Sequence, residues 1–304
     1  MSLPRRRVLT LPPALAAAGL AARAHASTAL TVAFAGSMGV LMDRGLSPAF
    51  TAKTGTPVHG IGEGAMALAH LLAASAMTAD VFMPVSAAPA RIVQAAGLGG
   101  QAVPVASTAI VLAYSPKSRF AADFAAAKGA DWTAILARPG LRFGRTNPAA
   151  DPQGQYGLYT LQLAALFYKQ PDLVRRVAGA GENPAQIFAE PSLLARLQAG
   201  QIDATLGYKS AVISQHLPYI ALPPQINFSD PAYAQSWYAK AGLTLTEKGK
   251  RITRHPNPLV FYAMVLKQAA DPAAARAFVR FLASPAGQKI FRQYGYDPGK
   301  GPTI

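Results

Sequence analysis

The sequence contains no cysteine, and this absence excludes disulfide bonds, thiol nucleophiles and thiolate metal sites. After residue 26, no apolar run reaches the roughly 20 residues that a membrane-spanning helix needs. Acidic residues are scarce, with 14 against 29 lysines and arginines. The histidines lack HExxH spacing, and the chain has no GxSxG or SxxK motif. We therefore expect no enzyme, and a secreted hydrolase is an alternative that no motif supports.

The positive charge of the chain restricts its partners. The whole chain has a net charge of +15, and the first 26 residues contribute four arginines and no acidic residue, which leaves +11 for the rest. A basic protein can bind nucleic acid, a membrane surface or a small anion. These charges are dispersed, and no basic helix, zinc-finger spacing or aromatic RNA-binding motif occurs. The pattern predicts a small-anion partner and no nucleic acid.

The N-terminus has the pattern of an export signal. Arg5, Arg6 and Arg7 precede a short apolar run over residues 8–20, and Ala24-His25-Ala26 forms a small-x-small cleavage pattern. This order predicts a signal peptide over residues 1–26 and a periplasmic location for the mature protein. The arginines also fit the twin-arginine pattern. A membrane anchor is the alternative, but the apolar run is too short to span a bilayer.

The first third of the mature chain alternates apolar strands with helical segments. Strands are predicted at residues 30–34, 56–61 and 79–83, each followed by a helix. This rhythm predicts an α/β protein with a parallel sheet. Ligand sites in such sheets lie beyond the carboxyl ends of the strands. We therefore expect a site near residues 36–37, 62–64 and 84–86.

Two long apolar strands, at residues 108–114 and 258–266, mark the expected crossings between two lobes. They are about 150 residues apart, which fits a usual domain size. One lobe would contain residues 27–107 and 266–304, and the other residues 108–265. Between the crossings we predict strands at 142–145 and 203–208 and helices at 151–168 and 190–199. A closing pair of helices is predicted up to residue 294.

Several motifs together resemble one protein family, the periplasmic molybdate/tungstate-binding proteins. Each motif is weak alone, but their order and spacing span nearly all of the mature chain. The motifs are Ala35-Gly36-Ser37, Ala79-Asp80-Val81, IVLAY at 110–114, ILARP at 135–139, RFG at 142–144, DPQG at 151–154, GYKS at 207–210, LPPQIN at 222–227 and FLASPAGQ at 281–288.

The resemblance implies a two-lobed periplasmic-binding-protein fold of type II, with the ligand in the cleft between the lobes. It implies a monomer that binds a tetrahedral oxyanion, molybdate or tungstate, without a cofactor and without catalysis. It further implies delivery to the permease of an ABC transporter. The same fold could instead bind sulfate, another oxyanion or a small organic anion.

The ligand-binding residues that the resemblance implies lie in strand-to-helix turns: Ser37, Gly64, Ala65, Asp151, Gly207 and Tyr208. Helix N-termini supply backbone donors and partial positive charge to an anion. Asp151 has two interpretations. Before Pro152 it is a favoured N-cap, and in the family an acidic side chain approaches the metal centre of the oxyanion itself. We expect no metal site beyond that contact.

Two positions depart from the family pattern. Ala65 stands where the family often has serine, and Gly207 stands where it has glutamate. One hydroxyl donor and one carboxylate are therefore missing. We expect either a tetrahedral anion held by backbone amides or a changed ligand. Glu63 is interpreted as a solvated loop carboxylate, and Lys209 could add positive charge at the site.

Overall fold

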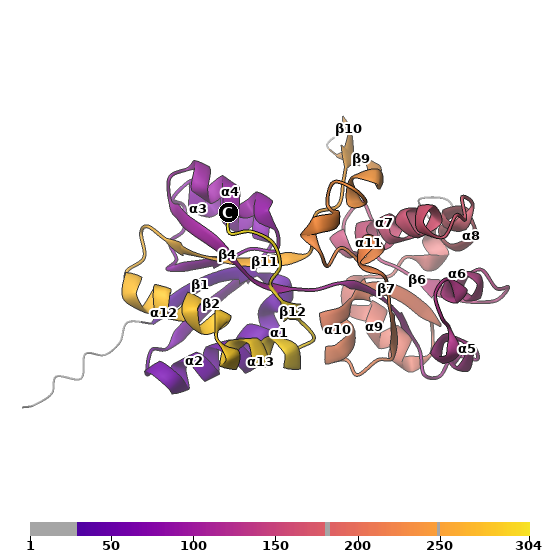
Figure 1. The fold of residues 1–304 in the computed structure, drawn as a ribbon, viewed down its shortest axis with the longest axis horizontal. Coiled ribbons are helices and arrows are strands. Elements are labelled where there is room, and N and C mark those ends of the chain that lie inside the picture. The colour runs from indigo at the N-terminus through magenta and orange to yellow at the C-terminus, as the bar shows by residue number, and fades with distance from the viewer. Residues whose placement is uncertain (1–28, 180–182, 248–249) are drawn as a thin grey trace, which may run out of the picture.

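Two separate β-sheets organise the chain in a computed structural model, which describes residues 29–179, 183–247 and 250–304. The first sheet has six strands in the order β12-β4-β11-β3-β1-β2, and the second has four in the order β6-β7-β5-β8. Each sheet with its helices forms one lobe, and the two lobes lie side by side (Figure 1). The predicted signal peptide, residues 1–26, lies outside the described residues.

The first lobe is built on a mixed sheet. Strand β1 runs parallel to β2 and β3, as the sequence predicts, whereas β11 runs antiparallel to β3 and β4, and β12 runs antiparallel to β4. Its strands are β1 (Leu30–Ala35), β2 (Val58–Glu63), β3 (Val81–Met83), β4 (Gly99–Ser107), β11 (Val260–Leu266) and β12 (Asp297–Pro298).

Helices cover both faces of the first sheet. Side chains of a strand alternate between the two faces, and β1 has buried apolar side chains on each of them. Leu30, Val32 and Phe34 of β1 pack into one core cluster with residues of the C-terminal helices. Ala33 packs on the opposite face. The helices of this lobe are α1 (Gly39–Leu41), α2 (Ser47–Thr54), α3 (Ala65–Ala73), α4 (Ala87–Ala95), α12 (Pro272–Ala283) and α13 (Pro285–Gln293), with the 3-10 turn η1 (Gly36–Met38) and the π turn η2 (Met42–Leu46).

The second lobe is built around β5, which pairs antiparallel with β7 and β8. Alternate residues of β5 again enter two clusters, with Ile110 and Leu112 on one face and Val111 and Ala113 on the other. Both faces of β5 are therefore buried, which explains its continuous apolar sequence. The strands are β5 (Ile110–Tyr114), β6 (Phe143–Gly144), β7 (Ala204–Tyr208) and β8 (Tyr219–Ala221).

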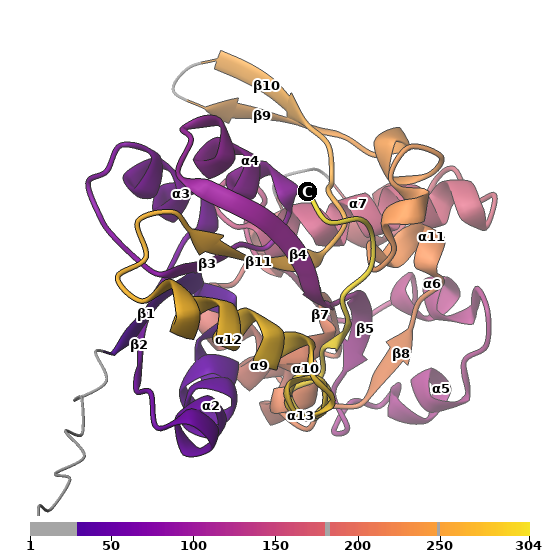
Figure 2. The ribbon, with the colours of Figure 1, turned by 60° about the vertical axis from the view of Figure 1, so that its left-hand side comes forward.

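The helices of the second lobe surround this sheet (Figure 2), and a hairpin of two strands extends above this lobe in Figure 1. The hairpin is β9 (Leu243–Glu247) with β10 (Lys250–Arg254), paired antiparallel. The helices are α5 (Ala121–Ala126), α6 (Asp131–Leu136), α7 (Pro152–Phe167), α8 (Leu173–Ala178), α9 (Glu190–Ala199), α10 (Lys209–Ser214) and α11 (Pro224–Asn227), with 3-10 turns η3 (Pro184–Gln186), η4 (Pro231–Tyr233) and η5 (Tyr238–Lys240).

The chain passes from the first sheet to the second between β4 and β5 and returns before β11. The predicted lobe boundary at residues 265 and 266 lies within β11, which pairs only with strands of the first sheet. A division that keeps this sheet whole places the second crossing before Val260. We propose that division for the two lobes.

Candidate functional site

A cavity of about 590 Å³ is lined by residues of both lobes. Five of the six predicted site residues line it: Ser37, Gly64, Ala65, Asp151 and Tyr208. They come from the ends of strands and the starts of helices, where the sequence places them. Turns that are far apart in the chain therefore meet at one cavity.

The wall from the first lobe consists of two neighbouring turns. Strands β1 and β2 pair in parallel with Ala35 opposite Glu63, so their carboxyl ends lie together. Ser37 lies in η1 directly after β1, and its side chain is exposed. Gly64 is the N-cap of α3 and makes no side-chain cap bond. The first amide groups of α3 therefore have no capping side chain, and an anion could accept their hydrogen bonds.

The wall from the second lobe includes the start of α7. Asp151 has extended backbone angles, and its Oδ1 accepts a hydrogen bond from the Gln153 amide at 2.7 Å. Pro152 follows as the first helical residue and has no N–H to donate. The predicted N-cap role of Asp151 is confirmed. One backbone donor of α7 is therefore already used by the protein itself.

Gly207 is the predicted site residue that does not line the cavity. It is buried inside β7, and a Cβ at this position would point toward the Gln153 side chain at 3.7 Å. Neighbouring residues of a strand face opposite sides, so Tyr208 lines the cavity while Gly207 faces α7. A glutamate side chain at position 207 would therefore begin on the face of β7 that packs against α7, not on the face at the cavity.

The charges at the cavity differ from the sequence expectation in one respect. Lys209 does not line the cavity, and its Nζ lies 2.7 and 2.8 Å from the two carboxylate oxygens of Asp297 in the first lobe. Glu63 lines the cavity together with Asp151, and the described lining residues include no lysine, arginine or histidine. Among the groups that line the cavity, the helix N-termini carry partial positive charge.

Further polar residues of the cavity escaped the sequence interpretation: Thr108, Ser210, Ser214, Gln215, Tyr294 and Tyr296. Thr108 begins the predicted strand at 108–114 and Ser210 ends the GYKS motif at 207–210, so both lie in predicted segments but were not assigned to the site. Tyr294 and Tyr296 come from the far end of the chain. The only local signal is two tyrosines on either side of Gly295, directly after the last helix.

Within residues 29–179, 183–247 and 250–304, no group of three or more His, Cys, Asp or Glu side chains could hold a metal ion. Over the same part of the chain, no helix is both long and apolar enough to cross a membrane.

Two α/β lobes with a cavity between them define a ligand-binding protein of the periplasmic-binding-protein class. The family described as bacterial extracellular solute-binding protein matches residues 30–297. The chain belongs to this family, whose members are solute-binding proteins.

Among its relatives, a putative ABC transporter molybdenum-binding protein of Haloferax volcanii is 30% identical over 293 residues, which cover 93% of this chain and 88% of the relative. A molybdate/tungstate-binding protein of Pyrococcus abyssi is 32% identical over 212 residues, which cover 63% of this chain and 60% of the relative. The chain spans about three fifths of the length of several curated relatives.

Solved structures confirm the predicted two-lobed fold. The substrate-binding domain of a putative molybdenum ABC transporter from Clostridium difficile superimposes with a TM-score of 0.61 and 17% sequence identity. The match covers 90% of this chain and 99% of that domain. At this identity the likeness establishes the fold, and the ligand has to be argued from the cavity.

Proposed function

We propose that this protein is the periplasmic binding component of an ABC importer and that it captures a tetrahedral oxyanion, molybdate or tungstate. The observation that carries the proposal is the meeting of two helix N-termini and a serine turn at one cavity. The starts of α3 and α7 and the exposed Ser37 line the same space from both lobes. Oxyanions need several hydrogen-bond donors, and helix starts supply them with a favourable dipole.

The relatives support the identity of the anion. Proteins that resemble this chain over most or much of its length bear names that include molybdenum, molybdate and tungstate. The described lining residues include no cationic side chain, which fits an anion bound through amides and hydroxyls. Because Gly207 has no carboxylate and faces away from the cavity, we infer that the anion keeps four oxygen neighbours.

Thermal-shift titration of the purified protein tests the proposal. A ligand that binds only the native state stabilises it by about 2.7 kcal/mol at a hundredfold excess over Kd. For a protein of this size, we expect molybdate and tungstate at micromolar levels to raise the Tm by about 5 °C or more. Sodium chloride at equal ionic strength is the control for general salt effects.

The same titration separates the alternative ligands. A shift with sulfate or a small carboxylate, and none with molybdate or tungstate, would reject the proposed ligand while keeping the binding fold. Turnover of an ester or phosphoester substrate by the same sample would favour the hydrolase alternative. The family and the lobed cavity support delivery of the ligand to a membrane permease, and we propose that the protein acts as a monomer.

A further inference from the structure

Tyr296 lies at the cavity between two aromatic side chains of the first lobe. Its ring centroid is 5.2 Å from that of Phe261 and 6.0 Å from that of Phe291. The residue is 3% exposed, and burial raises the pKa of its hydroxyl to about 12. The hydroxyl therefore stays protonated and uncharged at neutral pH. A buried hydroxyl needs hydrogen-bond partners, because leaving it unpaired in an apolar core is costly.

The Tyr296 hydroxyl contacts the turn after β1. Tyr296 Oη donates to the backbone carbonyl oxygen of Ser37 at 3.3 Å. Ser210, in the first turn of α10, lies against the same segment of chain, beside Gly295. Residues 295 and 296 therefore contact both the Ser37 turn and the second lobe.

The surrounding chain keeps Tyr296 against α10. Gly295 has φ +80°, and a Cβ there would lie 3.0 Å from the Ser210 Cα and from the Ile213 side chain. Such a close approach requires glycine. On the other side of Tyr296, Asp297 forms the ion pair with Lys209 of the second lobe.

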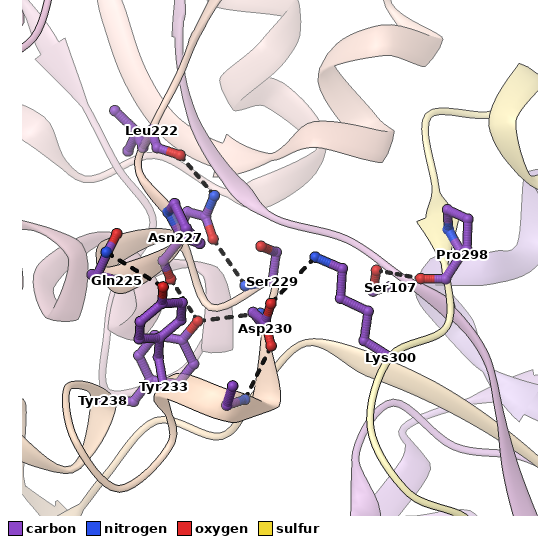
Figure 3. Close-up of polar contacts among 12 residues, drawn as sticks. Ser107, Leu222, Gln225, Asn227, Ser229, Asp230, Tyr233, Tyr238, Pro298 and Lys300 are labelled. Atoms are coloured by element: carbon purple, nitrogen blue, oxygen red, sulfur yellow. Dashed lines mark hydrogen bonds and ion pairs between the residues drawn. The ribbon is translucent and has the colours of Figure 1, made fainter.

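The residues after β12 make a second connection between the lobes, shown in Figure 3. Lys300 Nζ lies 3.5 Å from Asp230 Oδ2, and the Asp230 amide donates to the Tyr238 hydroxyl at 3.2 Å. Ser107 Oγ donates to the Pro298 carbonyl oxygen at 2.9 Å. The C-terminal segment therefore contacts both lobes at several points.

We propose that Tyr296 is a positioning residue, whose hydroxyl holds the Ser37 turn in the arrangement relative to α10 that binds the anion. Ser37 and Ser210 both line the cavity, and the chain on either side of Tyr296 packs on α10 through Gly295 and pairs with it through Asp297. The ring contributes to the core, and the hydroxyl fixes the Ser37 turn to this segment. This inference rests on the proposed oxyanion function.

The variant Tyr296→Phe tests the role of the hydroxyl while keeping the ring. We expect the affinity for tungstate, measured by calorimetry, to fall about fivefold, which corresponds to about 1 kcal/mol. Asp297→Asn, which removes the ion pair with Lys209 of α10, should weaken binding similarly. The double variant should lose no more than the weaker-binding single variant, because both changes break the same connection between the Ser37 turn and α10. Fully additive losses, or a Tyr296→Phe affinity within twofold of wild type, would overturn the proposal.

Tyr159→Phe is the matched control. Tyr159 is equally buried, and its hydroxyl donates to the Arg254 carbonyl oxygen at 3.0 Å within the second lobe, away from the cavity. We expect a comparable loss of stability with unchanged affinity. An equal loss of affinity in Tyr159→Phe would show that general destabilisation explains the Tyr296→Phe result, and would also overturn the proposal.

A measurement without ligand separates this inference from the proposed function. The chain has no cysteine, so Ala52→Cys in α2 and Ala195→Cys in α9, both exposed, can carry spin labels on the two lobes. We expect Tyr296→Phe, and not Tyr159→Phe, to broaden the distribution of distances between the labels. If the wild-type protein binds no oxyanion, the proposed function fails. In that case, an unchanged distribution of distances in Tyr296→Phe also overturns the positioning role of Tyr296. A broadened distribution upholds that role independently of the ligand.

Discussion

The two long helices that begin at the cavity, one from each lobe, differ in the donors that they leave for a ligand. Helix α3 of the first lobe begins after Gly64, and no side chain caps it. Helix α7 of the second lobe begins with Pro152, which has no N–H, and Asp151 accepts the hydrogen bond of the Gln153 amide. The first lobe therefore leaves more of its helix-start amides for an anion.

This difference divides the work of binding between the lobes. In the first lobe, the start of α3 and the Ser37 hydroxyl can act together as a cluster of donors. In the second lobe, Asp151 has already stabilised its helix and adds a negative charge to the cavity. Most of the affinity should therefore come from the first lobe, and the second lobe should chiefly enclose the ligand. Three substitutions test this division, from the largest expected effect to the smallest.

Ala65→Asp should have the largest effect, because it places a carboxylate at the start of α3 beside the ligand. Two like charges about 4 Å apart repel by several kcal/mol in a protein environment, so we expect anion affinity to fall at least about a hundredfold. The helix itself should gain about 0.3–1 kcal/mol from an acidic residue in its first turn. Calorimetry and ligand-free thermal unfolding measure the two opposite effects.

Ala88→Asp is the matched control for Ala65→Asp. Ala88 is exposed in the first turn of α4, a helix as long as α3, and it does not line the cavity. This variant adds the same charge to the same kind of helix start and should bind the anion as the wild type does. Unchanged affinity in Ala65→Asp would remove the start of α3 from the site.

Ser37→Ala should have an intermediate effect, because one hydroxyl donor is lost and the backbone of the turn remains. A hydrogen bond to a charged group contributes about 1.5–3 kcal/mol, so the affinity should fall about tenfold or more. Because the side chain is exposed, the Tm of the ligand-free protein should stay unchanged. Ser47→Ala, at the start of α2 and outside the cavity, is the control. Equal affinities of the two variants would exclude Ser37.

Asp151→Asn should have the smallest effect, and in the opposite direction. Asparagine caps helices as well as aspartate does, so stability should be kept. Removing a negative charge beside an anion should raise the affinity for tungstate and for sulfate a few-fold, as titration calorimetry can measure. Asp151→Ala, which loses the cap and about 1 kcal/mol of stability, is the comparison. A weaker affinity of Asp151→Asn for tungstate would instead assign the carboxylate a direct contact with the metal centre.

The sequence predicts those strands that are buried on both faces. Strands β5 and β11 are continuous apolar runs and β1 is apolar except for Thr31, because helices or loops cover both sides of each sheet. Strand β4 escaped prediction, since Gly99, Gly100 and Pro104 all disfavour a strand locally. Pro104 is tolerated where the pairing with β11 shifts register, next to Tyr262. The strand exists because β11 and β12 pair with it, and local sequence does not encode that pairing.

The residues of the candidate site also fall into two groups, those that local sequence signals locate and those that only the folded chain brings together. The turns after β1 and β2 and the start of α7 could be located from strand ends and capping residues, which are local signals. Gly207 and Tyr208 were predicted together, but the alternation of β7 sends them to different faces. Tyr296 could not be placed beside Ser37 from the sequence, because 259 residues separate them and only the folded sheet joins them.

The ion pair of Lys209 with Asp297 has a consequence for how an anion would arrive and depart. Lys209, between the cavity-lining Tyr208 and Ser210, is paired with Asp297 of the first lobe, and the described lining residues offer a ligand dipoles and no cationic side chain. Dispersed surface charge would speed the encounter with an anion, and salt would screen it over a Debye length of about 8 Å. Amide dipoles act only at contact. Capture would therefore depend on ionic strength and retention would not, and separation of the two lobes alone would remove the contacts that retain the anion.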